Sequence, residues 1–468
     1  MSRRLRITGG LVVTPAGVQQ TDIVVSGERV VDLGAQHGHD ADDIDAEGCY
    51  VLPGGVDPHT HLLPDVASAT RSAAFGGTTT AVCFTNPGPR ESASQAVIRG
   101  RRQMEKLAAI DVALHAILRE PDRVTTADLE RIRSMGVRAL KLFLAFPEQG
   151  LMASDGGLYE VMRAAARLGL LVRVHCENGS VIDALIREHL AKGKRQAGYF
   201  ARSRPPEVEE EAIARTLSIA GLAKAAVYVT HVTTAGGIGL IRDARARGQV
   251  AHAEVCLHHL LLDAGRYQGK SAERFLVAPP LRSKEHLEAL WSAVADGTVD
   301  TIGSDHAQSQ YRPRPKNSPS PRSGGRVGER GGERAKRPGD FTGLPYGLAG
   351  IELRTPLLLS EGMRRGLPIQ RLAQLASTRP AQLFGLFPRK GAISPGADAD
   401  LVVWDPRPEW KVKASALHDA VGHSPYSGMT VRGAIRYVFL RGRLVVAGGR
   451  WVEPASRGSY LSLASSGK

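Results

Sequence analysis

Two histidines spaced two residues apart, His59 and His61, are the first candidates for chemistry in this sequence. They end the run Leu52-Pro-Gly-Gly-Val-Asp-Pro-His-Thr-His61, which continues an apolar stretch over residues 49–56. Side chains at positions i and i+2 of a strand project from the same face, so the two imidazoles can converge on one metal ion. The alternative is that both are polar residues of a turn after Pro58.

Four further candidate ligands stand at or near the ends of other apolar, β-branched runs. Each run has the composition of a short strand. The candidates are Lys141 in residues 137–144, His175 in 170–175, His231 in 226–231 and Asp305 in 299–305. Further strands are predicted at 78–84, 112–118 and 249–257, with helices between strands such as 155–168, 207–223 and 283–295.

Eight strands that alternate with helices predict an α/β fold, a parallel (β/α)8 barrel. In such a barrel the C-terminal ends of the strands form one mouth, so six residues from His59 to Asp305 are expected to meet at one site. His258 and His259 follow the seventh predicted strand and are candidates for a second layer behind those ligands.

Metal-assisted hydrolysis explains this combination of residue types. Two divalent ions about 3.5 to 4 Å apart can share one hydroxide and stabilise the oxyanion of an amide. Four imidazoles and one carboxylate leave two cations short of negative charge, so an anionic bridge is needed. Lys141 can provide it as a carbamate formed with CO2, because desolvation at a strand end disfavours the ammonium. Asp305 would coordinate a metal and also carry the proton from the water to the leaving nitrogen.

The chain resembles the cyclic amidohydrolases of the amidohydrolase superfamily, most closely dihydropyrimidinase and hydantoinase. The motifs that carry this resemblance span nearly the whole chain: Gly54-Gly-Val-Asp-Pro-His-Thr-His61, Gly76-Gly-Thr-Thr-Thr80, the lysine strand, Val174-His-Cys-Glu-Asn-Gly179, Thr230-His-Val-Thr-Thr234, Pro279-Pro-Leu-Arg-Ser-Lys-Glu-His286, Gly303-Ser-Asp-His306 and Lys390-Gly-Ala-Ile-Ser-Pro-Gly-Ala-Asp-Ala-Asp-Leu401. The resemblance implies opening of a hydantoin or dihydropyrimidine ring at a C–N bond. It also implies a carboxylated Lys141 between two divalent metal ions, for which we expect zinc.

Four positions bear on the substrate. Relatives of this kind typically carry Tyr five residues after the bridging lysine, Ser before Pro-Pro-Leu-Arg and Asn before Gly in a later loop, where this chain has Phe146, Ala278 and Tyr346. Dihydroorotases carry Arg in His-x-His-x-Arg, where this chain has Leu63. An apolar pocket made by Phe146, Ala278 and Leu63 favours 5-substituted hydantoins over dihydroorotate.

Other functions stay open at this point. Allantoinase lacks the Tyr requirement and is the first alternative, with dihydroorotase as a second. A non-catalytic, dihydropyrimidinase-like interaction protein is a third, although such proteins lose metal ligands that this chain keeps. Whatever the activity, we expect a homo-oligomer, either a dimer or a tetramer.

The two ends of the chain are expected to fold together. Residues 1–57 and 386–468 contain short alternating strands and glycine turns, which predict a small β-sandwich beside a barrel over residues 58–385. The predicted strands cover residues 5–13, 21–30, 400–404, 434–440 and 443–446. The acidic motif at 397–404 is assigned to packing rather than to metal binding.

The composition agrees with a large enzyme of this architecture. The chain has 468 residues, of which 42% are hydrophobic, enough for a barrel with a satellite domain. It contains no run of 18 apolar residues and no signal-peptide core near its start, so we expect a cytoplasmic protein without membrane contact. Four cysteines without Cys-x-x-Cys spacing are expected to be reduced core thiols: Cys49, Cys83, Cys176 and Cys256.

The formal charge of +14 raises the question of nucleic-acid binding. Half of it lies between Arg312 and Arg337, where nine Lys or Arg face two Glu, a balance of +7. This stretch is rich in Pro, Gly and Ser, so it is predicted to form a mobile loop that acts as a lid or an interface element. Relative to the family that the chain resembles, residues 307–340 look like an insertion. No aromatic platform or recognition fold accompanies it, so a nucleic-acid function is not favoured.

Overall fold

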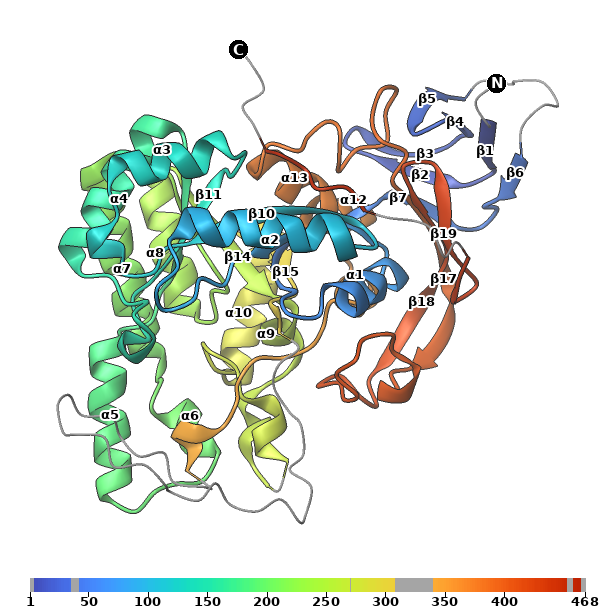
Figure 1. Cartoon of the computed structure of the whole chain (residues 1–468). Coiled ribbons are helices and arrows are strands. Elements are labelled where there is room, and N and C mark those ends of the chain that lie inside the picture. Colours follow the sequence, from blue (N-terminus) through green and yellow to red (C-terminus); the bar gives the residue numbers. More distant parts are fainter. Residues whose placement is uncertain (1–3, 35–41, 270, 308–339, 453–457, 464–468) are drawn as a thin grey trace.

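The computed structural model describes residues 4–34, 42–269, 271–307, 340–452 and 458–463 (Figure 1). The basic stretch at 312–337, and with it most of the predicted insertion, lies outside the described residues. The nucleic-acid and lid hypotheses for that stretch therefore stay untested by the fold.

Nine parallel strands form the central sheet, in the order β15-β14-β13-β12-β11-β10-β9-β8-β16. Their bounds are β8 Gly55–His61, β9 Thr78–Phe84, β10 Asp111–Ile117, β11 Ala139–Phe143, β12 Leu171–His175, β13 Val227–Val229, β14 Ala251–Cys256, β15 Thr301–Gly303 and β16 His306–Ala307. β15 and β16 stand at the two ends of this order but are only two residues apart in the chain. The sheet therefore closes on itself, and the Asp305 N–H donates to the His59 carbonyl across the closure at 2.9 Å.

Helices alternate with these strands, as the periodicity predicts. They include α1 Val66–Phe75, α2 Ala93–Leu107, α3 Thr126–Ser134, α4 Asp155–Leu168, α5 Gly179–Ala191, α7 Pro206–Ala223, α8 Ala235–Ala246, α10 Lys284–Ala295 and α11 Arg354–Arg364. Local capping explains where several begin: Ser92 and Gln95 form a capping box at α2, and Thr234 caps α8. The predicted (β/α)8 barrel is confirmed.

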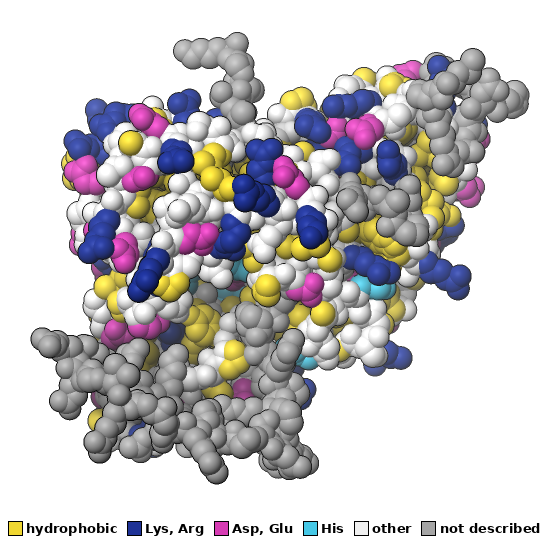
Figure 2. Space-filling view, viewed as in Figure 1, with side chains coloured by type: hydrophobic (Ala, Val, Ile, Leu, Met, Phe, Trp, Pro, Cys, Tyr) yellow, Lys and Arg dark blue, Asp and Glu magenta, His cyan; other side chains and the backbone are white. Residues whose placement is uncertain are grey.

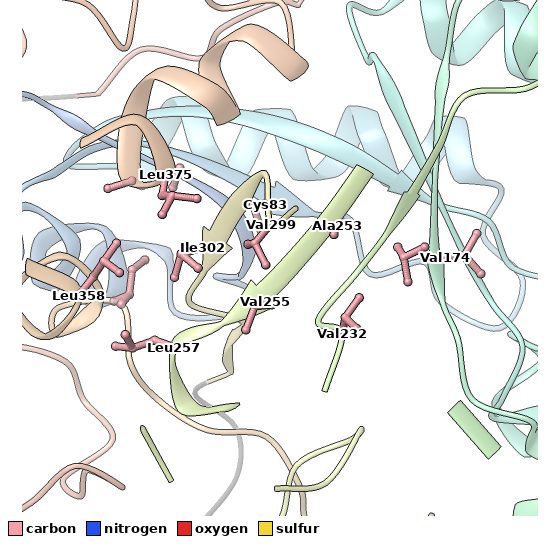
Figure 3. Packing of buried hydrophobic residues seen from close by; sticks show 14 of the residues in the cluster. Cys83, Val174, Val232, Ala253, Val255, Leu257, Val299, Ile302, Leu358 and Leu375 are labelled. Atoms are coloured by element: carbon pink, nitrogen blue, oxygen red, sulfur yellow. The ribbon is translucent and has the colours of Figure 1, made fainter. Parts of the chain in front are cut away.

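The main core lies between the barrel strands and the surrounding helices. Because parallel strands of a barrel are covered on both faces, their sequences are nearly continuous apolar runs. Figure 3 shows part of this cluster, including Val255 of β14, Ile302 of β15 and Leu358 of α11, each at most 1% exposed.

The two chain ends form a second body, coloured blue and red in Figure 1. A seven-stranded sheet has the order β20-β19-β18-β17-β7-β2-β3, and a four-stranded sheet has the order β5-β4-β1-β6. The first joins C-terminal strands to N-terminal ones through the pairing of β17 with β7. The bounds are β1 Arg4–Thr8, β2 Leu11–Thr14, β3 Gly17–Gln20, β4 Ile23–Ser26, β5 Arg29–Leu33, β6 Asp42–Asp45, β7 Tyr50–Pro53, β17 Leu401–Lys411, β18 Thr430–Leu440, β19 Arg443–Ala447 and β20 Arg450–Trp451.

Two predicted runs are each divided between two elements. Residues 5–13 form β1 and β2 rather than one strand, because Gly9 has a φ of +71° and turns the chain between them. The apolar stretch at 49–56 contributes β7 to the seven-stranded sheet and the start of β8 to the barrel. Hydrophobicity alone does not reveal that one apolar stretch forms two strands of two different sheets.

A buried lysine joins the terminal sheets to the barrel. Lys390 Nζ lies 2.6 Å from Asp111 Oδ2 on β10 and 2.8 Å from carboxylate oxygens of Asp398 and Asp400. The acids of the 397–404 motif thus face an ammonium, and Leu401 is fully buried. The motif therefore packs against the barrel through Lys390, the structural role that the sequence predicted.

The cysteines, the character of the helices and the surface charge complete the description of the fold. All four cysteines are buried and free, as predicted. None of the described helices combines the length and the apolar character needed to cross a membrane. On the face shown in Figure 2, basic side chains of the described residues lie among acidic and neutral ones.

Candidate metal centre

All six predicted ligands border one cavity of about 430 Å³ at the C-terminal ends of the barrel strands. β8 carries His59 and His61, β11 carries Lys141 and β12 ends at His175. The other two candidates, His231 and Asp305, follow β13 and β15 by two residues. Residues separated by up to 246 positions therefore meet here because every strand points the same way.

One half of the site is formed by His59, His61 and Asp305. The Nε2 atoms of His59 and His61 lie 3.1 and 3.2 Å from the same atom, Asp305 Oδ1. One donor atom from each residue falls within 4.8 Å of the others, close enough for all three to hold a single ion.

The other half is formed by His175, His231 and Lys141. His175 Nδ1 lies 3.1 Å from His231 Nε2. Lys141 Nζ is buried and donates to Thr230 Oγ1 at 2.7 Å. Each ring thus directs one nitrogen toward the other ring, which is an arrangement that a shared cation would use.

Burial and neighbouring charges together set the protonation of these groups. Burial lowers the pKa of His61, of His175 and, well below its usual range, of His231. Neutral imidazole is the form that binds metals. Burial also lowers the pKa of Lys141 to about 7, helped by the nearby Arg173 guanidinium. Burial alone would raise the pKa of Asp305, but His59 and His61 outweigh it and hold that pKa well below its usual range.

A buried ion pair lies directly behind His59. Glu254 Oε1 contacts His59 Nδ1 at short range, and Glu254 Oε2 lies 2.8 Å from Arg173 Nη2. Tyr228 donates its hydroxyl to Glu254 at 2.7 Å, and Arg173 donates to the Pro58 carbonyl. Because Nδ1 of His59 faces this carboxylate, Nε2 is left to face the cavity.

His175 has a carboxylate partner of its own. Its Nε2 lies 2.8 Å from Glu177 Oε2, so Nδ1 faces His231. Such outer carboxylates fix the orientation and tautomer of a histidine ligand. Sequence reasoning missed Glu177, Arg173 and Glu254. The available signal was a charged residue inside, or just after, an otherwise apolar strand of a buried parallel sheet.

The predicted second-layer histidines do not border the cavity. His258 and His259 are both buried, and neither is among the residues that border the cavity. His259 Nε2 lies 3.0 Å from the Pro279 carbonyl, and His258 has no hydrogen-bond partner among the described residues.

Backbone strain marks the cavity as well. Six described non-glycine residues have positive φ, and three of them border this cavity: His231 at 40°, Asp305 at 45° and Phe146 at 64°. Non-glycine residues in this region cost of the order of 1–3 kcal/mol each, so the surrounding packing must hold them there. Such outliers cluster at functional sites.

One wall of the cavity is apolar. All four residues assigned to the substrate, Leu63, Phe146, Ala278 and Tyr346, border it. The rings of Phe146 and Tyr346 stack with an interplanar angle of 11° and centroids 5.9 Å apart. Gln149 Nε2 donates to the Tyr346 hydroxyl at 3.1 Å, so the polar end of this wall is part of a local network.

The donor set fits a pair of divalent metal ions. Nitrogen and carboxylate donors suit Zn²⁺ and neighbouring first-row metals. The four imidazoles are oriented by packing and by Glu254 and Glu177, and Lys141 stands buried among them. Among the described residues, two other groups of three potential ligands exist: Cys256, His258 and His259, and His59, Glu254 and Cys256. All members of both groups are buried, and of these residues only His59 borders the cavity.

The sequence matches the pattern that defines the amidohydrolase family over residues 50–445. The D-hydantoinase of Geobacillus stearothermophilus is 36% identical over 477 residues, which cover 98% of this chain and 97% of that protein. The D-hydantoinase of Ralstonia pickettii is 33% identical, with 97% and 98% covered.

Solved structures show the same fold. That of the D-hydantoinase from Bacillus sp. AR9 matches with a TM-score of 0.90 at 37% identity, and the dihydropyrimidinase from Brevibacillus agri NCHU1002 matches at 0.88 and 36%. Each match covers 98% of both chains.

The contact between His175 and Glu177 leads to a prediction on metal affinity. Glu177→Leu removes the carboxylate that orients the ring, and outer partners of this kind are typically worth about 10- to 100-fold in affinity. Glu177→Gln keeps an acceptor for Nε2 and should lose less. Metal content per chain after graded dialysis against a chelator measures both. Equal retention by wild type and Glu177→Leu would contradict the prediction.

Proposed function

The chain belongs to the amidohydrolase family, and from this membership we propose that it is a metal-dependent hydrolase that opens the C–N bond of a hydantoin- or dihydropyrimidine-type ring. The observation that carries the proposal is the convergence of four histidines, one lysine and one aspartate on a single cavity. The resemblance to D-hydantoinases and a dihydropyrimidinase over nearly the full chain supports the substrate class.

We assign His59, His61 and Asp305 to one divalent ion and His175 and His231 to a second, with Lys141 as the shared ligand in N6-carboxylated form. Zinc is the expected metal because the donors are mainly imidazole nitrogens. When bound, the ions would acidify a water molecule and polarise the ring carbonyl.

The surroundings of Lys141 support its proposed carboxylation. Only a neutral amine attacks CO2, and a lysine with a pKa of about 7 is substantially neutral at physiological pH. Thr230 Oγ1 at 2.7 Å supplies a hydrogen-bonding partner for the modified group. The carbamate adds negative charge that imidazole ligands do not supply.

Asp305 is the proton carrier in this proposal. It borders the cavity, and its low pKa keeps it ionised and able to accept a proton from the attacking water. The same carboxyl group then donates that proton to the ring nitrogen as the C–N bond breaks. The hydrogen bond from the Asp305 N–H to the His59 carbonyl holds the group in position for both steps.

The cavity wall favours hydantoins with a hydrophobic substituent at position 5. Leu63, Phe146 and Ala278 offer apolar surface, and the described residues that border the cavity include no arginine to hold a substrate carboxylate. This disfavours dihydroorotate. A purely structural role is disfavoured too, because all six ligand positions are filled by residues that bind metal. The homo-oligomeric state, a dimer or tetramer, and the cytoplasmic location stay predictions, and light scattering tests the first.

Lys141 provides the first test. Lys141→Ala should abolish hydrolysis of a 5-substituted hydantoin and lower the metal content, because the shared anionic ligand is lost. Short carboxylic acids should restore part of the activity by occupying the vacated space. Lys141→Arg fills that space with a group that cannot be carboxylated, so it should not be rescued. Full metal loading and activity in Lys141→Ala would contradict the assignment.

Asp305→Asn provides the second test. The amide keeps one oxygen for the metal but cannot accept the proton, so turnover should fall by at least roughly 100-fold. Metal analysis of the same preparation separates loss of the proton carrier from loss of the ion. Near-normal turnover with normal metal content would mean that another group moves the proton.

Phe146→Tyr tests the substrate wall. The Phe146 ring lies 5.0 Å from the His175 ring, so a hydroxyl there is added close to the reacting carbonyl. One well-placed donor to an oxyanion is worth about 10- to 1000-fold in rate. Dihydrouracil hydrolysis should rise accordingly, whereas Phe143→Tyr, a second change at the cavity wall, should give no such gain. An unchanged rate in Phe146→Tyr, with fold and metal intact, would show that Phe146 is shaped for another cyclic amide.

A further inference from the structure

A second cavity, of about 400 Å³, lies at the opposite end of the barrel from the metal site. It lies where the chain enters β14 and β15, whereas the metal ligands lie toward the other ends of the strands. The residues there that border it are Gln249, Val250, Ala251, His252, Gly297, Val299 and Asp300. Three arginines also border it: Arg245 of α8, Arg371 of α12 Ile369–Ala373 and Arg379 of α13 Arg379–Leu383. This cavity takes no part in the proposed hydrolysis.

Asp300 is the one carboxylate among the described residues that border this cavity, and its oxygens are saturated. Oδ2 accepts from Arg245 Nη2 at 2.5 Å and from the Ala253 N–H at 2.9 Å. Oδ1 accepts from Arg379 Nε and Nη2 at 3.1 and 2.9 Å, with His252 Nδ1 3.6 Å away. Asp300 therefore has no lone pair left for a further guanidinium.

Arg371 has no carboxylate within 4.0 Å in the part of the chain that the structure describes. Its Nε donates to the Val294 carbonyl at 3.0 Å and its Nη2 to the Val299 carbonyl at 2.6 Å. These contacts leave the two N–H groups of Nη1 without a partner among the described residues. Asp296, the other acid that acts on Arg371 electrostatically, is already paired with Arg242 and Thr298.

Three guanidiniums held against one carboxylate leave the cavity with an excess of two positive charges. Like charges brought together at a partly buried site are destabilising unless an anion offsets them. A guanidinium presents parallel N–H donors that match the oxygens of a phosphate. A phosphate monoester carries about −1.5 to −2 charges at pH 7, which matches the excess.

We propose that this arginine cavity is a binding site for a small phosphate dianion, either inorganic phosphate or a phosphate monoester. The free N–H groups of Arg371 contact the phosphate oxygens, and Arg245 and Arg379 supply the remaining positive field. The described residues that border the cavity include no Phe, Tyr or Trp on which a nucleobase could stack, and the one ring there, that of His252, has its Nδ1 3.6 Å from Asp300 Oδ1. The phosphate group, rather than the organic part, is thus the recognised element.

Titration calorimetry of the metal-loaded full chain, purified without phosphate, tests this site. Inorganic phosphate and a simple alkyl phosphate monoester are the two probes, and chloride at equal ionic strength is the blank. We expect saturable binding with a Kd of roughly 1 mM or tighter. A preference for one probe identifies free phosphate or the ester as the better ligand.

Two variants and one control locate the binding. Arg371→Gln removes the guanidinium whose Nη1 faces the proposed ligand, and Val250→Glu places a carboxylate at the rim on a side chain that is 55% exposed. Each should weaken binding at least roughly 10-fold, the usual consequence of losing a charged hydrogen bond or adding a like charge. Ile98→Glu adds the same charge on α2, where the side chain is 37% exposed, and should bind like wild type.

The outcomes decide the proposal. Hydantoin hydrolysis and metal content should be unchanged in all three variants, which confirms that they fold. If Arg371→Gln does not fold, Val250→Glu decides alone. Absence of saturable binding, or wild-type affinity in Val250→Glu, overturns the proposal. Binding of single-stranded oligonucleotides without binding of either small probe also overturns it, in favour of a nucleic-acid surface.

Discussion

The buried pair of Glu254 and Arg173 is the contact on which the geometry of the metal site depends. Both side chains are fully inaccessible to solvent. Through them β14 is joined to β12, to Tyr228 of β13 and to His59 and the Pro58 carbonyl of β8. An isolated charge at this depth would cost several kcal/mol, so neither partner is tolerated without the other. The pair adds little net stability, but it fixes which nitrogen of His59 faces the cavity.

Barrel closure imposes the second constraint. Asp305 reaches His59 only because β15 and β16 complete the ring of strands. The hydrogen bond from the Asp305 N–H to the His59 carbonyl lies at this closure. Asp305 and His231 both leave their strands with positive φ, a conformation that turns the side chain sharply at the strand end. The strain there is stored locally and is offset by the packing of the whole barrel. A site of this kind forms only when the fold is complete.

The sequence singles out the six candidate ligands because each lies in, or just after, an apolar strand, where a polar residue is conspicuous, and the structure brings all six to one cavity. The barrel follows from the same alternation of strands and helices. The supporting residues were harder to recognise. Arg173 and Glu254 lie inside strands that are otherwise apolar, and such a pattern indicates a strand but not a role for its charged residue. The two residues pair with each other although they are 81 positions apart in the sequence. No local pattern encodes such a pairing. The division of residues 5–13 and 49–56 between elements also depends on tertiary contacts.

The departures of this chain from the typical family pattern lie in the apolar wall and not in the metal ligands. Phe146, Ala278 and Tyr346 border the same cavity as the histidines, Lys141 and Asp305. In the proposed function the first set contacts the ring substituent and the second set acts at the bond that breaks. Metal chemistry requires fixed donors at fixed positions, but a hydrophobic wall can change by one side chain at a modest cost in binding energy. Substrate choice can therefore change while the reaction stays the same. Because Phe146 stacks on Tyr346, a change at either position alters the surface that both rings present, and the two residues together shape this part of the wall.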